Sequence, residues 1–251
     1  MTQPNILPYN ETEFRDRFQQ TEIYQRLSQD FDHVSFDNTV EWDWAPTPRE
    51  RLALRRQSLF SAVPFYYLEF LTKHNPKQIL DIGCGANYFK HYIPTVVGVA
   101  AESPDNYFYR GDVHGEFNAD WVQNNQSKID SFFSICSLHF VPLNNLRQRV
   151  LDAASTLAPN GRAYLAMNVS RMCERMWWHL PQEQHLFDQS VDMHTADQII
   201  RKQLTDMPFT YEVFDLDLAV SCHRDRRDDY CPKFDNMVDG NLRMVIWNNK
   251  I

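Results

Sequence analysis

The residues best suited to chemistry lie about a third of the way along the chain. The segment reads Ile79-Leu80-Asp81-Ile82-Gly83-Cys84-Gly85, an apolar strand pattern that leads directly into a turn with two glycines. Glycines at such a turn let the backbone approach a ligand that a Cβ atom would obstruct. A dinucleotide-binding turn has a third glycine, and Tyr88 stands at that position instead. The pattern predicts a nucleotide-like ligand at the end of a parallel strand.

The same residues resemble a known motif. An acid followed by Ile-Gly-Cys-Gly resembles motif I of the class I S-adenosylmethionine-dependent methyltransferases. The resemblance implies that Gly83, Cys84 and Gly85 pass under the methionine part of S-adenosylmethionine. It also implies that Asp81 orients the turn or reaches the amino group of the cofactor. An acid that only caps backbone donors at the strand end is the simpler interpretation of Asp81, and it does not exclude either role.

Two more cofactor contacts follow from the resemblance. In this family an acid at the end of the second strand accepts hydrogen bonds from the ribose hydroxyls, which suits a group that only accepts. The usual position holds Ala100, and Glu102 is the nearest acid. The acid after the third strand meets the adenine amino group, and Asp112, with the backbone of Val113, fits that role. The alternatives are a surface acid for Glu102 and a turn aspartate for Asp112.

The segment after the fourth apolar run, from Ser134 to Pro142, resembles the small-molecule branch of the family. Ser137 is expected to contact the cofactor there. His139 is the candidate base, because imidazole exchanges a proton near neutral pH, although it could simply shape the pocket. The sequence has no (Asp/Asn/Ser)-Pro-Pro-(Tyr/Phe) loop and no cysteine directly after a proline, the two patterns typical of DNA methylation.

A substrate-side insertion is expected around residues 169–193, where relatives often place one. Trp177 could stack on a planar substrate and Arg175 could pair with a carboxylate or phosphate, or the tryptophan could simply bury its helix. Cys222-His223 with Cys231 lacks the paired spacing of a zinc site, so no metal is expected. The arginines between residues 49 and 56 are interpreted as a solvated helix face rather than a phosphate site.

Composition narrows the class of partner. The chain has 251 residues, a formal net charge of −8, and 43% hydrophobic residues, enough for a substantial core. The negative charge argues against nonspecific duplex binding, which needs a surplus of Lys and Arg. The five cysteines are scattered and odd in number, which favours a reducing compartment. No apolar stretch is long enough to span a membrane. A soluble cytoplasmic protein with a small-molecule substrate is expected, and nucleic acid is not the expected partner.

The elements that must position these residues alternate between strand and helix. An amphipathic helix is expected over residues 10–30, and a second from about Thr47, kinked or ended by Pro64 and continuing over 65–71. Strands are expected at 79–82, 95–99, 107–109, 129–136, 162–168, 211–220 and 242–247, and helices at 88–93, 146–157 and 195–204. The last two strands have no helix between them, which the resemblance interprets as an antiparallel closing pair.

The predicted fold class is therefore α/β: a Rossmann-like doubly wound sheet, mostly parallel with an antiparallel C-terminal strand, plus N-terminal helices. The predicted domains are an N-terminal helical extension (1–75) that packs on a methyltransferase-like domain (76–251). The resemblance implies methyl transfer from S-adenosylmethionine by in-line displacement. The alternatives are a non-catalytic scaffold or regulatory subunit, a nucleic-acid methyltransferase, and a Rossmann-like enzyme with another nucleotide, against which the missing third glycine counts.

Overall fold

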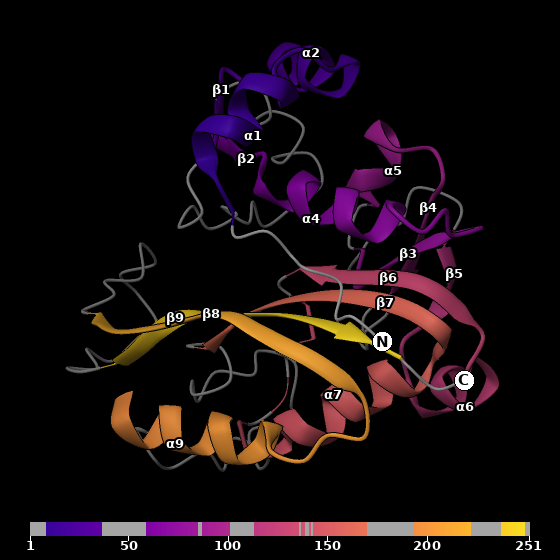
Figure 1. Cartoon of the computed structure of the whole chain (residues 1–251), viewed down its shortest axis with the longest axis vertical. Coiled ribbons are helices and arrows are strands. Elements are labelled where there is room, and N and C mark those ends of the chain that lie inside the picture. The colour runs from indigo at the N-terminus through magenta and orange to yellow at the C-terminus, as the bar shows by residue number, and fades with distance from the viewer. Residues whose placement is uncertain are drawn as a thin grey trace, which may run out of the picture. The chain divides into compact units, whose positions relative to one another are not determined.

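The computed structural model describes most of the predicted elements (Figure 1). It describes residues 9–36, 59–84, 87–100, 113–135, 137–138, 141, 143–169, 193–221 and 237–248. The helices are α1 (Glu11–Phe18), α2 (Glu22–Asp30), α4 (Val63–Thr72), α5 (Tyr88–Tyr92), α6 (Ala119–Asn124), α7 (Leu146–Ser155), α9 (Met193–Leu204) and the 3-10 turn η1 (Leu143–Asn145). The strands are β1 (His33–Ser35), β2 (Leu59–Ser61), β3 (Ile79–Ile82), β4 (Val96–Ala100), β5 (Val113–Glu116), β6 (Ile129–Ile135), β7 (Leu157–Asn168), β8 (Thr210–Ser221) and β9 (Met237–Trp247).

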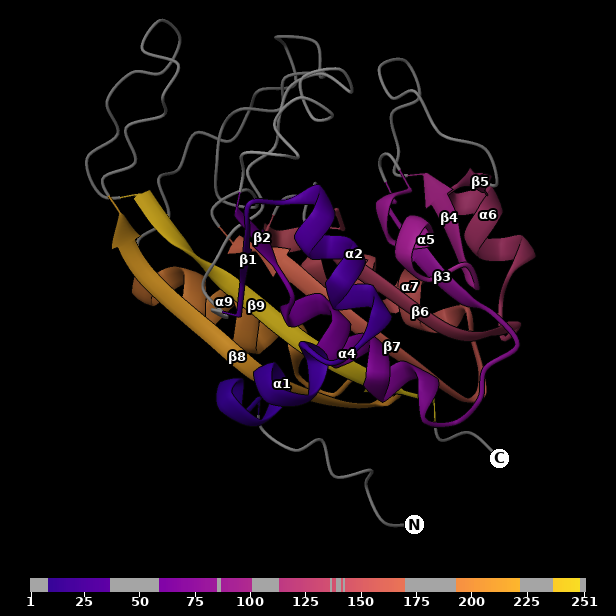
Figure 2. The same cartoon turned by 90° about the horizontal axis from the view of Figure 1, so that it is seen from above.

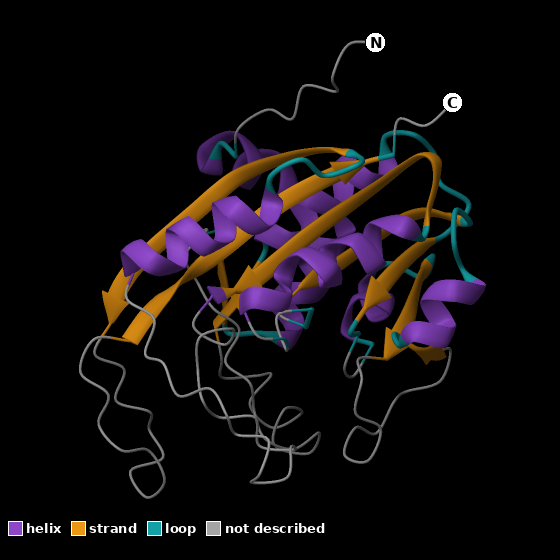
Figure 3. Ribbon diagram, turned by 90° about the horizontal axis from the view of Figure 1, so that it is seen from below, coloured by secondary structure: helices purple, strands orange, loops and turns teal. Residues whose placement is uncertain are grey.

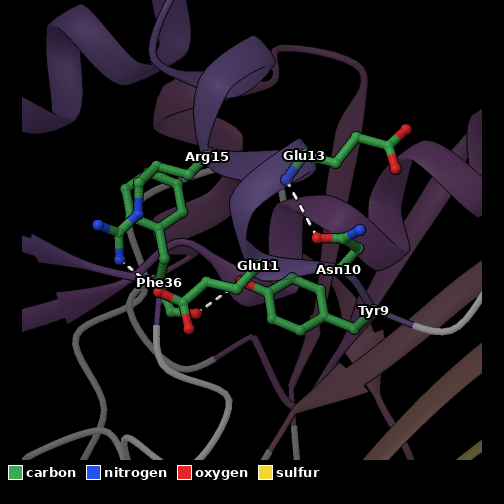
Figure 4. A network of polar contacts seen from close by, with 6 residues as sticks. All are labelled: Tyr9, Asn10, Glu11, Glu13, Arg15 and Phe36. Carbon is green, nitrogen blue, oxygen red and sulfur yellow. Dashed lines mark hydrogen bonds and ion pairs between the residues drawn. The ribbon is translucent and has the colours of Figure 1, made fainter.

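The first helical segment is divided into two helices. Asn10 caps α1 by accepting a hydrogen bond from the Glu13 N–H (3.2 Å), and the Tyr9 hydroxyl donates to the Phe36 carbonyl (2.6 Å; Figure 4). Thr21 interrupts the predicted single helix, because its hydroxyl oxygen accepts from the Tyr24 N–H and so begins α2. Phe14 and Phe18 of α1 are buried and their rings stack with centroids 4.9 Å apart.

The expected second helix is wrong at its described end. Leu59–Ser61 is a strand, β2, which pairs in parallel with β1. Pro64 stands in the first turn of α4 rather than at a kink. Proline is favourable there because the first helical N–H groups have no partner within the helix. The residues between 37 and 58, including Thr47 and the arginine cluster, lie outside the described ranges.

One seven-stranded sheet carries the rest of the described elements, in the order β5-β4-β3-β6-β7-β9-β8. β3 pairs in parallel with β4 and β6, and β4 pairs in parallel with β5. β9 pairs antiparallel with both β7 and β8. The strand order reverses direction at β3, and open α/β sheets bind ligands at the carboxyl ends of strands where this happens. The predicted fold class is confirmed.

The chain divides into two compact units. One comprises residues 1–117 with 131–133, and the other comprises 118–130 with 134–251. In the first unit, β3 and β4 are buried along their whole length, and α5 lies against β4 (Figure 2). The N-terminal helices belong to the same unit as these strands. The predicted domain boundary at residue 76 stays a prediction.

In the second unit, α7 and α9 pack against each other and cover one face of the strands β7, β9 and β8 (Figure 1). Arg147, near the start of α7, donates to the carbonyls of Gln203 and Asp206 (both 3.1 Å) where α9 ends. A cation suits this place because the last carbonyls of a helix lack partners and carry the negative end of its dipole.

The β8–β9 pair extends beyond the end of β7. β7 pairs with β9 only as far as Asn168, opposite Asn241, whereas β8 and β9 continue to pair as far as Ser221 and Met237 (Figure 3). The two strands therefore form a ribbon beyond the end of β7. Among the helices in the described ranges, none is long and apolar enough to cross a membrane.

Candidate functional site

The turn after β3 is held against the neighbouring strand. Gly83 has φ 81°, a backbone conformation that favours glycine. The N–H groups of Gly83 and Cys84 both donate to the Val99 carbonyl of β4, at 2.7 and 3.1 Å. The Asn87 N–H then donates to the Cys84 carbonyl (2.7 Å), and Asn87 begins α5 with φ 53°. The predicted strand-to-turn transition is confirmed, and two of its amide donors are already used within the protein.

Gly98 of β4, which the sequence motifs did not single out, allows this turn to approach β4 closely. A Cβ atom on Gly98 would lie 2.6 Å from Cys84 Sγ and 3.0 Å from Asn87 Oδ1. Only glycine at this position lets both side chains pack onto the strand. The available signal was a single glycine inside the buried run Val96-Val97-Gly98-Val99, since such a glycine marks a close approach of another segment.

Asp81 is the most unusual ionisable group of the site. It is the next-to-last residue of β3, is 4% exposed, and receives no hydrogen bond at its carboxyl from any residue in the described ranges. Burial disfavours the charged form and raises the pKa of Asp81 to about 8. In the ligand-free chain at neutral pH, this carboxyl is therefore mostly protonated.

The Cys84 thiol is not a nucleophile. It is buried against β4, and burial, followed by the nearby Asp81, raises its pKa to about 12. Only the backbone N–H groups of Cys84 and Asn87 act in the opposite direction. Because the thiolate is the reactive form, a thiol with so high a pKa is inert at neutral pH. Cys84 can serve a ligand only through its backbone and the shape of the turn.

Two backbone donors of the turn are occupied within the protein. The amides of Gly83 and Cys84 both donate to the Val99 carbonyl, and the acid Asp81 is close enough to raise the pKa of Cys84. A pyrophosphate needs several free N–H donors and the start of a substantial helix, and α5 has only five residues. A protonated amine, which donates only, matches carbonyl oxygens and a carboxylate. The chemistry of the turn fits the amino-acid end of S-adenosylmethionine better than the phosphates of a dinucleotide.

The two other predicted acids lie outside the described residues. β4 ends in Ala100, which is 2% exposed, so the position expected of a ribose acid holds a buried methyl group. Glu102 and Asp112 both belong to the range 101–112, as does the predicted strand 107–109. The strand that pairs with β4 is β5, which begins at Val113, and its last residue, Glu116, stands opposite Ala100. The acid at the carboxyl end of β5 is thus Glu116, a residue that the sequence motifs did not single out.

The end of β6 carries two hydroxyls that satisfy each other. Ser134 Oγ lies 2.7 Å from Ser137 Oγ, and both side chains are buried. The pair is neutral and buried at the place where the sequence predicts a cofactor contact by Ser137. His139, the candidate base, lies outside the described residues, as do Gly85, Arg175 and Trp177. The cysteines and histidine between 222 and 231 also lie outside them.

No family model and no curated protein sequence matches the chain. Solved structures with a similar fold include the N-methyltransferase NodS of Bradyrhizobium japonicum WM9 in complex with S-adenosyl-L-homocysteine (13% identity, TM-score 0.41, 92% of this chain and 100% of that one). Another is a SAM-dependent methyltransferase of Archaeoglobus fulgidus (12% identity, TM-score 0.41, 74% and 91%).

The CurJ carbon methyltransferase is also similar (14% identity, TM-score 0.39), and the match covers 75% of this chain but only 52% of that longer one. The strands of this chain define its fold without these comparisons. β9 is the antiparallel strand inserted between β7 and β8, beside a sheet whose other described pairs are parallel. The chain has a Rossmann-like, mostly parallel sheet with an antiparallel C-terminal strand.

Proposed function

We propose that this protein transfers the methyl group of S-adenosylmethionine to a small-molecule acceptor. The observation that carries the proposal is the turn after β3, where a buried acid lies beside two backbone amides that are already occupied within the protein. Such a site selects a cationic donor over an anionic phosphate. The fold places this turn at the edge of the sheet where ligands of open α/β proteins bind.

Asp81 has a specific part in this proposal. An ammonium group beside the carboxyl favours its charged form and so offsets the burial that keeps it protonated. Binding of the amino-acid end of the cofactor then releases a proton from Asp81. Gly83 and Cys84 contribute backbone surface and carbonyl oxygens, and we propose that Gly85 completes the same turn. The side chain of Cys84 faces β4 and takes no part in the chemistry.

The remaining cofactor contacts are proposals from the sequence. We propose that Glu102 accepts from the ribose hydroxyls, because the strand end itself offers only Ala100. Asp112, with the backbone of Val113, is proposed for the adenine amino group, and Glu116 is its competitor at the end of β5. For Ser137 we propose a backbone contact, since its hydroxyl is bonded to Ser134.

The chain's contribution to the reaction is mainly positioning. When bound, S-adenosylmethionine supplies an electrophilic methyl group on a sulfonium centre. The protein must hold the acceptor in line with it and exclude water, which can account for much of a rate enhancement without a strong base. We propose that His139 takes the proton of the acceptor, if the acceptor loses one. Arg175 and Trp177 are proposed to hold an anionic or planar acceptor.

The formal charge of −8 supports a small acceptor rather than a nucleic acid, and the scattered cysteines support a cytoplasmic setting. These proposals concern the acceptor and the location, and the cofactor assignment does not depend on them.

Calorimetry tests the cofactor assignment directly. We expect S-adenosylhomocysteine to bind and NAD to give no heat. The Asp81→Asn variant removes the carboxylate at nearly constant volume and should lose most of the affinity. Asp16→Asn, an exposed acid on α1, is the matched control and should bind as the wild type does. Tight binding of NAD with no response to S-adenosylhomocysteine would refute the assignment.

A second experiment tests the acceptor. Methyl transfer from labelled S-adenosylmethionine is measured across pooled metabolites and, separately, across oligonucleotides at two salt concentrations. We expect label to enter the metabolite fraction. Label in the oligonucleotides, with binding that weakens steeply as salt rises, would replace the small-molecule acceptor by a nucleic acid. Cofactor binding without transfer to either class would indicate a non-catalytic scaffold.

A further inference from the structure

The helix that follows the glycine turn is too short to hold its own position. α5 spans only Tyr88–Tyr92, a little more than one turn. Forming the first turn of a helix is unfavourable, so a helix of this length depends on tertiary contacts for its stability. Asn87, its N-cap, donates its N–H to the Cys84 carbonyl and so joins α5 to the candidate cofactor turn. Whatever fixes α5 therefore also fixes that turn.

Polar contacts from α2 supply part of this support. Asp30, the last residue of α2, accepts a hydrogen bond from the Tyr92 hydroxyl (Oδ2 to Oη, 2.5 Å). The same Oδ2 lies 3.5 Å from His91 Nε2. Arg26, one turn earlier on α2, donates to the His91 carbonyl, and its guanidinium lies 5.4 Å from the centroid of the Tyr92 ring. Two residues of α2 thus bind the last two residues of α5.

Aromatic packing also supports α5. Phe65 of α4 lies 5.6 Å from Phe89 and 6.1 Å from Tyr92, measured between ring centroids. Phe18 of α1 packs on the same Phe65 ring at 5.4 Å. Tyr92 is 3% exposed and Phe89 is 5% exposed, so both rings are embedded. Such ring pairs stabilise the packing beyond the effect of the area that they bury. The polar contacts from α2 therefore act on a helix whose apolar face is already in place.

We propose that α2 supports the cofactor site indirectly, through α5. In this proposal Asp30 is a positioning residue that holds α5 and the glycine turn in the geometry that binds the cofactor. The inference rests on the proposed function, because it concerns the affinity for S-adenosylmethionine. It goes beyond that function because it assigns a role to the N-terminal helices, which contribute no residue to the turn itself. Loss of the Asp30–Tyr92 contact should loosen the turn while the fold persists.

The test is a double-mutant cycle on the ligand-free and liganded protein. Asp30→Ala removes the acceptor, and Tyr92→Phe removes only the donor hydroxyl while it keeps the ring against Phe65. We expect each variant to weaken S-adenosylhomocysteine binding by about three- to tenfold, and the double variant to be no weaker than the worse single one. Asp30→Asn keeps an amide oxygen as acceptor and should restore part of the affinity.

The control is Glu69→Ala. Glu69 of α4 forms an exposed ion pair with Arg17 of α1, a contact of similar kind that does not involve α5. Hydrogen exchange of the peptide from Gly83 to Tyr92, measured without ligand, should be faster in Asp30→Ala and Tyr92→Phe but not in Glu69→Ala. A purely structural role would lower the melting temperature of all three variants and change neither the exchange of this peptide nor the affinity.

The outcomes separate the two proposals. Wild-type binding with unchanged affinity in Asp30→Ala and Tyr92→Phe would overturn the positioning role and leave the proposed function intact. Faster exchange of the turn without loss of affinity would also overturn it, since the turn would then tolerate the motion. A wild-type protein that does not bind S-adenosylhomocysteine would refute the proposed function, and this inference with it.

Discussion

The buried polar side chains near the carboxyl ends of β3 and β6 differ in whether they can ionise and in whether a neighbouring residue forms a hydrogen bond with them. At β6, Ser134 and Ser137 are neutral and bond to each other at 2.7 Å. At β3, Asp81 is ionisable, 4% exposed, and receives no hydrogen bond from the described residues. Native proteins normally satisfy buried polar groups, as the serine pair does. Asp81 differs from this pair because burial alone, and no hydrogen bond from a described residue, acts on its pKa.

The two places should therefore respond differently to a bound ligand. A satisfied pair of hydroxyls stabilises the protein by itself and gains nothing from a ligand. A protonated acid in an apolar strand carries a free-energy cost that a cation can remove. We therefore expect changes at the β3 end to act on affinity and changes at the β6 end to act on stability.

Asp81→Asn should have the largest effect and act in two directions. Affinity for S-adenosylhomocysteine should fall by about 100-fold, the scale of a lost hydrogen bond to a charged group. Without ligand, the variant should be more stable than the wild type by roughly 2–4 kcal/mol at pH 7, because it no longer buries an ionisable group. Calorimetry measures the first quantity and denaturant unfolding the second.

The pH dependence of this effect has a defined sign. The pKa of Asp81 is about 8 in the folded chain, against an ordinary value of 3.8. Between these values the folded chain keeps a proton that the unfolded chain releases, so wild-type stability should fall as pH rises from about 4 to 8. Asp81→Asn should lack this decline, and the two proteins should be nearly equally stable near pH 4. Parallel curves for the two proteins would show that Asp81 is ionised when buried.

Gly98→Ala and Gly161→Ala form a matched pair of substitutions, because in each variant the added Cβ atom would lie too close to another atom of the protein. At Gly98 the obstacle is the Cys84 side chain (2.6 Å), and at Gly161 it is the Ala158 carbonyl oxygen (2.8 Å). We expect Gly98→Ala to displace the turn and weaken S-adenosylhomocysteine binding about tenfold, a loss within the range for overpacking. Gly161→Ala should lower the melting temperature and leave binding unchanged.

A second substitution makes the Gly98 prediction sharper. Cys84→Ala removes the sulfur that the new methyl group would strike, so the double variant Gly98→Ala/Cys84→Ala should recover part of the affinity. If Cys84→Ala alone abolishes binding, the thiol itself contacts the ligand, and its orientation toward β4 is not the one that binds.

The adenine contact is assigned by comparing two acids. Asp112→Asn and Glu116→Gln each remove one carboxylate at nearly constant volume. Substitution of the acid that contacts the adenine amino group should weaken S-adenosylhomocysteine binding about three- to tenfold, and substitution of the other acid should have no effect. Adenosine competition identifies which part of the ligand is affected. Equal, small losses for both variants would leave backbone groups as the adenine contact.

Ser137→Ala should have the smallest effect on binding. If Ser137 contacts the cofactor through its backbone, affinity should change by less than about threefold. Stability should fall by roughly 1–3 kcal/mol, because Ser134 loses the hydroxyl to which it bonds inside the protein. The double variant Ser134→Ala/Ser137→Ala should recover much of that stability. A large loss of affinity in Ser137→Ala would mean that the hydroxyl turns toward the ligand.

The sheet could be predicted from the sequence because its strands are apolar on both faces. Ile79–Ile82 and Val96–Ala100 are buried throughout, which produces the continuous apolar runs typical of parallel strands covered on both sides. The antiparallel closing pair was predicted correctly from the missing helix between the last two strands. By contrast, the strand Leu59–Ser61 was predicted as helix. Its three residues carry no period, and β1, its partner among the described strands, lies far away in sequence.

The site could be predicted only where a local sequence motif marks it. Gly83 follows from the motif, but the need for Gly98 depends on a contact between β4 and the turn that spacing alone does not reveal. The support of α5 by Asp30 spans 62 residues and has no sequence signature. The sequence did not indicate the strand Val113–Glu116, because its four residues include Gly115 and two polar side chains and so lack an apolar run.

The position of β9 has a consequence for how the chain acquires its structure during synthesis. β8 precedes β9 along the chain, yet it joins the sheet only through β9, which lies between it and β7. While the ribosome is still making the residues after β8, that strand and the edge of β7 expose unpaired backbone groups. Exposed strand edges of this kind attract other chains. The second unit therefore completes its sheet late, and slow translation after residue 221 would lengthen the period in which aggregation competes with folding.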